Sequence, residues 1–95
     1  MIISLDYDDT YTKDTEFWDK VVKLGKEHGH TFYCVTARAL EPDNYEPKPN
    51  MKFYCTNYRY KKEYMKSLGI HIDVWIDDTP EALIEGTIYR HFNND

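Results

Sequence analysis

Hydrophobic residues along this chain gather in four short runs that predict β-strands. The runs cover residues 1–5, 31–36, 51–56 and 70–76. They are rich in β-branched and aromatic residues, which favour extended backbone with a buried face. In the last run every second residue is apolar, and these positions are expected on one face of the strand: Ile70, Ile72, Val74 and Ile76.

Apolar residues at helical spacing fill much of the sequence between these runs. The longest helix is predicted over 15–28, and a shorter one over 60–68. A last short helix is predicted over 80–86, because a proline opens it and a glycine closes it. A fifth strand is predicted over 87–89. Residues 37–50 contain three prolines and no periodicity, which indicates a loop.

Strands that alternate with helices imply crossover connections, because parallel neighbours cannot be joined by a tight turn. The expected fold class is therefore α/β, with three layers in a Rossmann-like arrangement: a mainly parallel sheet and helices on both faces. Ninety-five residues suit one such unit, so residues 1–95 are expected to form a single domain.

Composition and charge narrow the classes of protein that this chain could be. Its formal net charge is −5, which disfavours a protein that coats nucleic acid non-specifically. No apolar run reaches the length of a membrane span, and the first residues lack the basic start of a secretion signal, so a soluble, cytoplasmic protein is expected. Cys34 and Cys55 each lie inside an apolar run and are expected to be buried free thiols. A core this small could gain stability by dimerising, which makes a homodimer one expectation.

Carboxylates follow two of the predicted strands. Asp6, Asp8 and Asp9 come after the first strand, and Asp77 and Asp78 come after the fourth. In an open parallel sheet, ligands bind beyond the carboxyl ends of the strands, so the two groups are expected to meet there. A cation would relieve their mutual repulsion, and Mg²⁺ prefers oxygen ligands of this kind. One such pair alone is more often a turn or a helix cap, but two groups at two strand ends favour a metal site.

Four segments, in order along the chain, resemble the motifs of the haloacid dehalogenase (HAD) superfamily of phosphotransferases. Residues 6–10 (DYDDT) resemble the first motif, Thr36 resembles the second, and Asp77 with Asp78 resembles the fourth. A lysine at the start of the 60–68 helix resembles the third. The resemblance implies a HAD-like fold and a Mg²⁺-dependent phosphatase that forms an aspartyl-phosphate.

The resemblance also implies a role for each matching residue in catalysis. Asp6 would be the nucleophile that attacks phosphorus, and Asp8 would act first as general acid and then as general base. Thr10 would steady the first loop through its hydroxyl group, next to the substrate. Thr36 would hydrogen-bond the phosphoryl oxygens with its side chain and nearby backbone N–H groups.

For the metal, the resemblance implies a ligand set built from both acidic groups. Mg²⁺ would be held by a carboxylate oxygen of Asp6, the backbone carbonyl of Asp8 and the side chain of Asp78. Asp77 would lie beside the ion or just behind its ligands.

The lysine of the third motif has two candidates. Lys61 and Lys62 both lie at the start of the short helix, which is the part nearest the strand ends. Lys61 is preferred as the residue that offsets the negative charge of Asp6 and of the phosphoryl group, and Lys62 is expected to contact the substrate. The alternative is that both lysines lie on a solvated face of the helix and have no role in the site.

The sequence has no room for the cap domain that most members of this family carry, which implies a capless enzyme with an open site. An open site favours a nucleotide or a nucleic-acid terminal phosphate as substrate, with small phosphorylated metabolites as the alternative. Arg38, Tyr58 and Arg59 are expected at its rim, together with Tyr7 and Tyr11. Nine tyrosines in the chain could, however, line any rim by chance.

Two readings from other classes remain beside the phosphatase. The chain could be a phospho-accepting signalling module similar to a response-regulator receiver, although residues 51–56 are followed by Asn57 where such a module carries its acceptor. It could also be a catalytically silent protein that uses its acidic residues to bind a metal ion. Turnover of a phosphate ester separates these alternatives from an enzyme.

Overall fold

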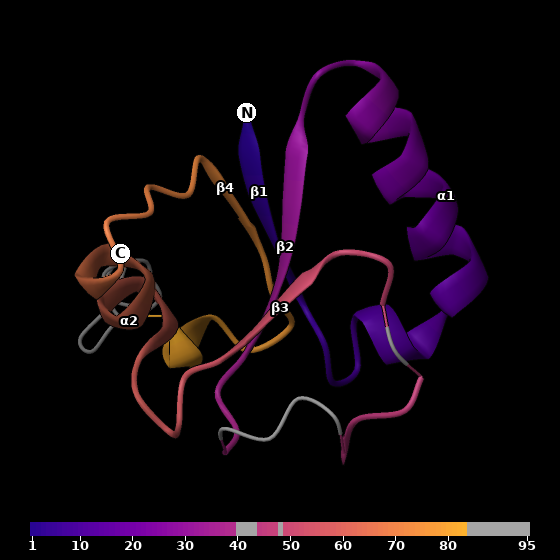
Figure 1. The fold of residues 1–95 in the computed structure, drawn as a ribbon. Coiled ribbons are helices and arrows are strands. Elements are labelled where there is room, and N and C mark those ends of the chain that lie inside the picture. Colours follow the sequence, from indigo (N-terminus) through magenta and orange to yellow (C-terminus); the bar gives the residue numbers. More distant parts are fainter. Residues whose placement is uncertain (40–43, 48, 84–95) are drawn as a thin grey trace, which may run out of the picture.

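A computed structural model describes residues 1–39, 44–47 and 49–83 of the protein. Its four strands and two α-helices are β1 (Ile2–Asp6), α1 (Thr15–Glu27), β2 (Thr31–Thr36), β3 (Lys52–Cys55), α2 (Lys61–Ser67) and β4 (Val74–Ile76). Short 3₁₀ turns follow β1 and β4: η1 (Tyr11–Lys13) and η3 (Pro80–Ala82). The strands form one parallel sheet in the order β3-β2-β1-β4 (Figure 1). The predicted α/β class and parallel sheet are confirmed.

One α-helix covers each face of the sheet, so the described chain has three layers (Figure 1). On one face, Val22 of α1 belongs to the same buried cluster as Leu5 and Cys34. On the other face, Met65 of α2 belongs to a cluster with Val35. Neighbouring residues of β2 therefore serve opposite layers, as the two-residue period of a strand requires. Cys34 and Cys55 are buried, as predicted.

The fourth strand is shorter than the sequence predicted, because it begins only after Asp73. The backbone N–H of Ile2 donates to Asp73 Oδ2 at 2.7 Å, and the N–H of Asp73 donates to the Ile2 carbonyl at 2.8 Å. Regular pairing then starts at Val74, which is partly exposed. The expected single apolar face over residues 70–76 is therefore wrong, since Ile72 and Ile76 belong to the two opposite clusters.

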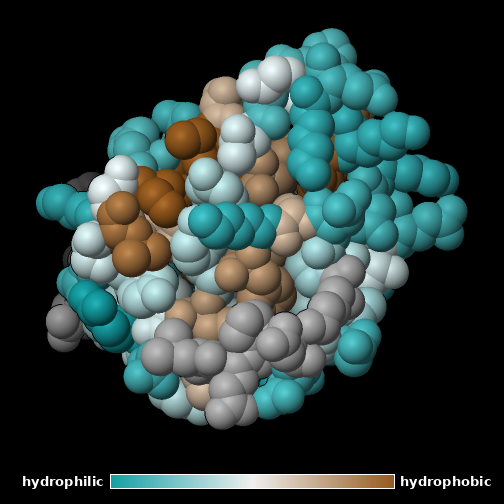
Figure 2. All heavy atoms as spheres, in the orientation of Figure 1, coloured by the Kyte–Doolittle hydropathy of each residue, from teal (hydrophilic) through white to brown (hydrophobic). Residues whose placement is uncertain are grey.

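The end of the chain matches its prediction only in part. Pro80 opens a 3₁₀ turn that runs to Ala82, where the sequence predicted a helix over 80–86. Residues 84–86 of that helix and the strand predicted over 87–89 lie outside the described residues. Within the part of the chain that the structure describes, neither helix has the length and apolar character needed to cross a lipid bilayer. Figure 2 shows a hydrophilic surface on the side where α1 lies.

The strand order fixes where a ligand would bind. The chain runs from β1 to β2 and β3 on one side of the sheet, and β4 then pairs with the other edge of β1. In sheets wound in this way, ligands occupy the crevice outside the carboxyl ends of the strands where the order reverses. Here that point lies between β1 and β4, where the two acidic groups emerge. The connections that lead into the helices are short, over residues 7–14 and 56–60.

Candidate functional site

A buried lysine joins the two acidic groups at the carboxyl ends of β1 and β4. Asp6 is the last residue of β1, and Lys61 is the first residue of α2. The Lys61 Nζ lies 2.7 Å from Asp6 Oδ1 and 2.6 Å from Asp77 Oδ2. All three side chains are at least nine-tenths buried. Of the two adjacent lysines that the sequence offered, Lys61 is the one that reaches the carboxylates.

Further hydrogen bonds hold both carboxylates of this ion-pair network. The hydroxyl group of Thr10 donates to Asp6 Oδ2 at 3.1 Å, so both oxygens of Asp6 have a donor. The backbone N–H of Thr79 donates to Asp77 Oδ1 at 2.9 Å. This bond from the residue two positions after an aspartate forms an Asx turn. Thr79 was not among the residues predicted for the site, although aspartate is a residue that favours such turns. Each of the four carboxylate oxygens of Asp6 and Asp77 therefore has a hydrogen-bond donor.

The carboxyl group of Asp6 has an unusual affinity for its proton. Burial raises the pKa of Asp6 to about 7, a hydrogen bond with the side chain of Asp78 raises it too, and Lys61 opposes both. The same hydrogen bond lowers the pKa of Asp78. Burial acts to lower the pKa of Lys61, but its hydrogen bonds with Asp6 and Asp77 prevail and raise it. These directions are those expected when a protonated Asp6 carboxyl group donates to the Asp78 carboxylate beside a charged lysine.

The acidic residues form a group that could hold a metal ion. One oxygen each from Asp6, Asp77 and Asp78 lie within 4.8 Å of one another. A donor set made only of oxygen suits a hard cation such as Mg²⁺. The two oxygens of Asp77 already accept hydrogen bonds from Lys61 and Thr79. Both oxygens of Asp6 accept hydrogen bonds as well, so these contacts do not separate Asp6 from Asp77, whereas Asp78 has an exposed carboxylate beside them that is open to a ligand role.

The raised pKa of Asp6 predicts how the stability of the metal-free protein depends on pH. The pKa of Asp6 rises from 3.8 to about 7 on folding, so between these values the folded state holds a proton that the unfolded state has released. The free energy of unfolding should therefore fall as pH rises from about 4 to about 7, by at most about 4 kcal/mol from this group. Urea unfolding in EDTA would measure the fall. In Asp78→Asn it should be smaller, and an equal fall in both proteins would contradict the hydrogen bond between Asp6 and Asp78.

Asp8 is not a member of this acidic group and pairs with an arginine. Its Oδ2 lies 3.0 Å from the Nε of Arg38, and both side chains are more than a third exposed. Thr36, the last residue of β2, is buried and lies one residue beyond Val35, which pairs with Asp6 in the sheet. The expected ligand role of Asp8, through its backbone carbonyl, stays a prediction.

The loop after β3 holds the loop after β2 in place. The backbone N–H of Asn57 donates to the carbonyl of Arg38 at 2.8 Å, and that of Tyr58 donates to the carbonyl of Ala37 at 2.6 Å. These bonds require two successive residues in the left-handed region, with φ of 55° at Asn57 and 67° at Tyr58. The backbone that carries Arg38 toward Asp8 is thus fixed from a third strand.

Several residues predicted at the rim of the site lie elsewhere. Tyr7 and Tyr11 are buried in the core on the α1 side, because their rings pack there and their hydroxyl groups donate to the Pro47 carbonyl and to Asp19. The guanidinium of Arg59 lies over the Tyr64 ring of α2, 5.5 Å from the ring centroid.

Tyr58, predicted at the rim, and Lys62, expected to contact the substrate, have different outcomes. Tyr58 is highly exposed on the loop after β3. Lys62 lines a separate groove beside α2, because the next residue of a helix points in a different direction from Lys61. The structure therefore places Lys62 in this groove, and the substrate contact expected for it stays a prediction.

Comparisons of this chain with models of protein families, with curated proteins and with solved structures found no match. The resemblance to the HAD superfamily therefore stays a prediction from four motifs. What the chain can do has to be argued from its own residues and their geometry.

Proposed function

We propose that this protein is a Mg²⁺-dependent phosphatase of the HAD type that hydrolyses phosphomonoesters through an aspartyl-phosphate on Asp6. One observation carries the proposal: Asp6 is buried at the end of β1, with its two oxygens bonded to Lys61 and Thr10 and with Asp77 and Asp78 beside it. A cation and a hydroxyl group aimed at one carboxylate are what a positioned anionic nucleophile requires. Phosphoryl transfer depends mainly on positioning and charge neutralisation, and this site provides both.

The reaction has two steps, and each moves one proton. In the first, an Asp6 oxygen forms a bond to phosphorus, the bond to the leaving oxygen breaks, and Asp8 gives that oxygen a proton. In the second, a water oxygen attacks phosphorus, Asp8 takes the proton from the water, and the bond between Asp6 and phosphorus breaks. Lys61 offsets the negative charge of Asp6 throughout, while Asp77 holds Lys61 in place.

Two of the expected metal ligands, Asp6 and Asp78, are linked by a hydrogen bond when no metal ion is bound. Asp6 and Asp78 would hold Mg²⁺, together with the backbone carbonyl of Asp8. Bound there, Mg²⁺ supplies positive charge that lowers the repulsion between the phosphoryl group and the carboxylates.

The loops after β2 and β1 would bind and release the phosphoryl group. Thr36 ends β2 beside the partner of Asp6, and the backbone N–H groups after it would bind phosphoryl oxygens together with its hydroxyl group. Arg38 pairs with Asp8 in the free protein and would turn to the incoming phosphate, which leaves Asp8 able to exchange protons. The short connections over 7–14 and 56–60 leave no room for an inserted cap, which favours a large substrate such as a nucleotide or a nucleic-acid end.

The decisive experiment is the release of phosphate from a panel of substrates with Mg²⁺ and with EDTA. The panel holds nucleoside monophosphates, oligonucleotides with a 3′ or 5′ phosphate, phosphorylated sugars and a chromogenic ester. We expect multiple turnovers that require Mg²⁺. A single equivalent of phosphate transferred to the protein would favour a receiver-like module instead, and no reaction by folded, metal-bound protein would favour a silent metal-binding protein.

Asp78→Asn should separate metal binding from the other requirements of the reaction. Because a direct carboxylate ligand is lost, we expect half-maximal activity to need at least about tenfold more Mg²⁺. Titration of Mg²⁺ at saturating substrate measures this directly. The same titration curve for wild type and variant would assign the metal to other residues.

A further inference from the structure

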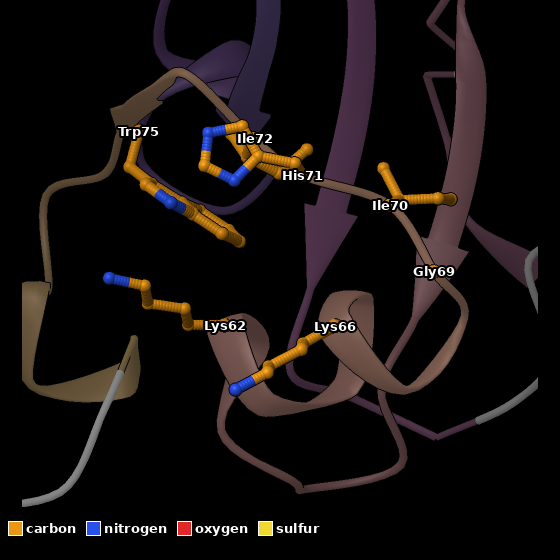
Figure 3. Close-up of a pocket in the computed structure, with 7 residues that line it drawn as sticks. All are labelled: Lys62, Lys66, Gly69, Ile70, His71, Ile72 and Trp75. Atoms are coloured by element: carbon orange, nitrogen blue, oxygen red, sulfur yellow. The ribbon is translucent and has the colours of Figure 1, made fainter.

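A groove runs beside α2 on the face of the sheet that this helix covers (Figure 3). It has a volume of about 400 Å³ and lies between the helix and the segment that leads into β4. The groove is lined by Lys62, Lys66, Gly69, Ile70, His71, Ile72 and Trp75. No step of the proposed reaction uses it.

The two walls of the groove differ in chemistry. Lys62 and Lys66 are four residues apart on α2, so both ammonium groups extend from the same side of the helix. Trp75 extends its indole from β4 toward the helix, with His71 on the same wall (Figure 3). His71 has an acidic neighbour in Asp73, whose Oδ1 lies 3.5 Å from the His71 Nε2. In a chain of net charge −5, the groove thus pairs two cations with an aromatic surface.

The groove and the carboxylate site share the same two elements. Lys61 turns into the site while Lys62, the next residue, lines the groove. On the opposite wall, Trp75 lines the groove while Asp77, two residues later, holds Lys61. The lining of the groove runs from Lys62, near the start of α2, to Gly69 beyond its end, and the seven residues of the helix span about 10 Å. A chain bound along the groove would have its end beside Asp6.

We propose that this groove binds single-stranded nucleic acid next to its terminal phosphate. A base stacks on Trp75, and the backbone phosphates meet Lys62 and Lys66. Stacking on an aromatic ring combined with cations along the backbone is how proteins bind single strands without reading their sequence. The assignment of the terminal phosphate to Asp6 rests on the proposed function, whereas binding in the groove does not.

The first test measures binding of a dye-labelled oligothymidylate that has no terminal phosphate, by fluorescence anisotropy over a range of salt concentrations. The double variant Lys62→Gln, Lys66→Gln should bind about tenfold more weakly at low salt. The slope of log affinity against log salt should also fall by about 1.4, which corresponds to two lost phosphate contacts on a single strand. The matched control is Lys20→Gln, Lys23→Gln, which makes the same change in charge on α1 and should leave both values unchanged.

A second measurement reports on stacking. In a Trp18→Phe background, Trp75 is the single tryptophan, and we expect its fluorescence to be quenched as the oligothymidylate binds. If that background does not fold, the same titration of wild type against the Lys62→Gln, Lys66→Gln variant serves, because only Trp75 lies in the groove.

The proposal is overturned if the wild type does not bind the oligothymidylate, or if the Lys62→Gln, Lys66→Gln variant binds it with unchanged affinity and salt slope. Lysine-dependent binding of a polyglutamate peptide in place of the oligonucleotide would overturn it as well. Since the probe has no terminal phosphate, a protein that binds it but never releases phosphate would refute the phosphatase and leave the groove assignment standing.

Discussion

Replacing Asp6 with asparagine will abolish turnover, with kcat at least about 10⁴-fold lower than wild type. Asparagine keeps the shape of the side chain but cannot form the acyl-phosphate, so the first step has no nucleophile. Lys61 would keep its 2.6 Å contact with Asp77, so the variant should stay folded. Phosphate release from the best substrate of the panel measures the loss, and circular dichroism checks the fold.

The matched control is Asp9→Asn in the same loop. Asp9 is exposed and has a φ of 61°, a backbone conformation that asparagine tolerates better than most residues. It should keep kcat within about twofold of wild type, since surface substitutions away from a site change little. Substantial turnover by Asp6→Asn would show that phosphate transfer does not pass through this carboxylate.

Replacing Lys61 with methionine will destabilise the protein by about 3–5 kcal/mol, the usual result of removing one member of a buried ion pair. Methionine fills a similar volume, but it leaves Asp6 and Asp77 buried without their cation. Their side chains are only 8% and 4% exposed, so water cannot take its place. Urea unfolding monitored by circular dichroism measures the change, and added Mg²⁺ should recover part of it.

The adjacent lysine provides the control for this substitution. Lys62→Met changes the same residue type one position later, on the exposed surface of α2, and should stay within about 0.5 kcal/mol of wild type. Equal destabilisation by both variants would mean that the helix, and not the ion pair, is what responds. Wild-type stability in Lys61→Met would contradict the buried network.

The sequence could predict those residues of the site that lie at the ends of strands. Asp6 and Asp77 had to lie at the same edge, because each closes an apolar run and parallel strands share a carboxyl end. The sequence could not decide whether Lys61 or Lys62 contacts the carboxylates. Adjacent helical residues point about 100° apart, and which one faces the sheet depends on how α2 packs.

The sequence pattern did not predict the burial of Tyr7 and Tyr11 or the position at which the fourth strand begins. Tyr7 and Tyr11 have a polar end and an apolar ring, and the core accepted them because Pro47 and Asp19 satisfy their hydroxyl groups. Over 70–76, an alternation that looked continuous was interrupted by Asp73, whose side chain binds the backbone of β1. Both outcomes depend on partners far away in the chain.

The contacts of Lys61 with distant parts of the chain have a consequence for folding during synthesis. Its two partners come from the first strand of the chain and from the segment after β4, and 55 residues separate Lys61 from Asp6. A chain leaving the ribosome completes β1, β2 and β3 long before Asp77 emerges, so the ion-pair network can close only when β4 joins the exposed edge of β1. Such distant contacts form late because loop closure must precede them. We therefore expect the acidic centre to stay unassembled on nascent chains until β4 has paired with β1.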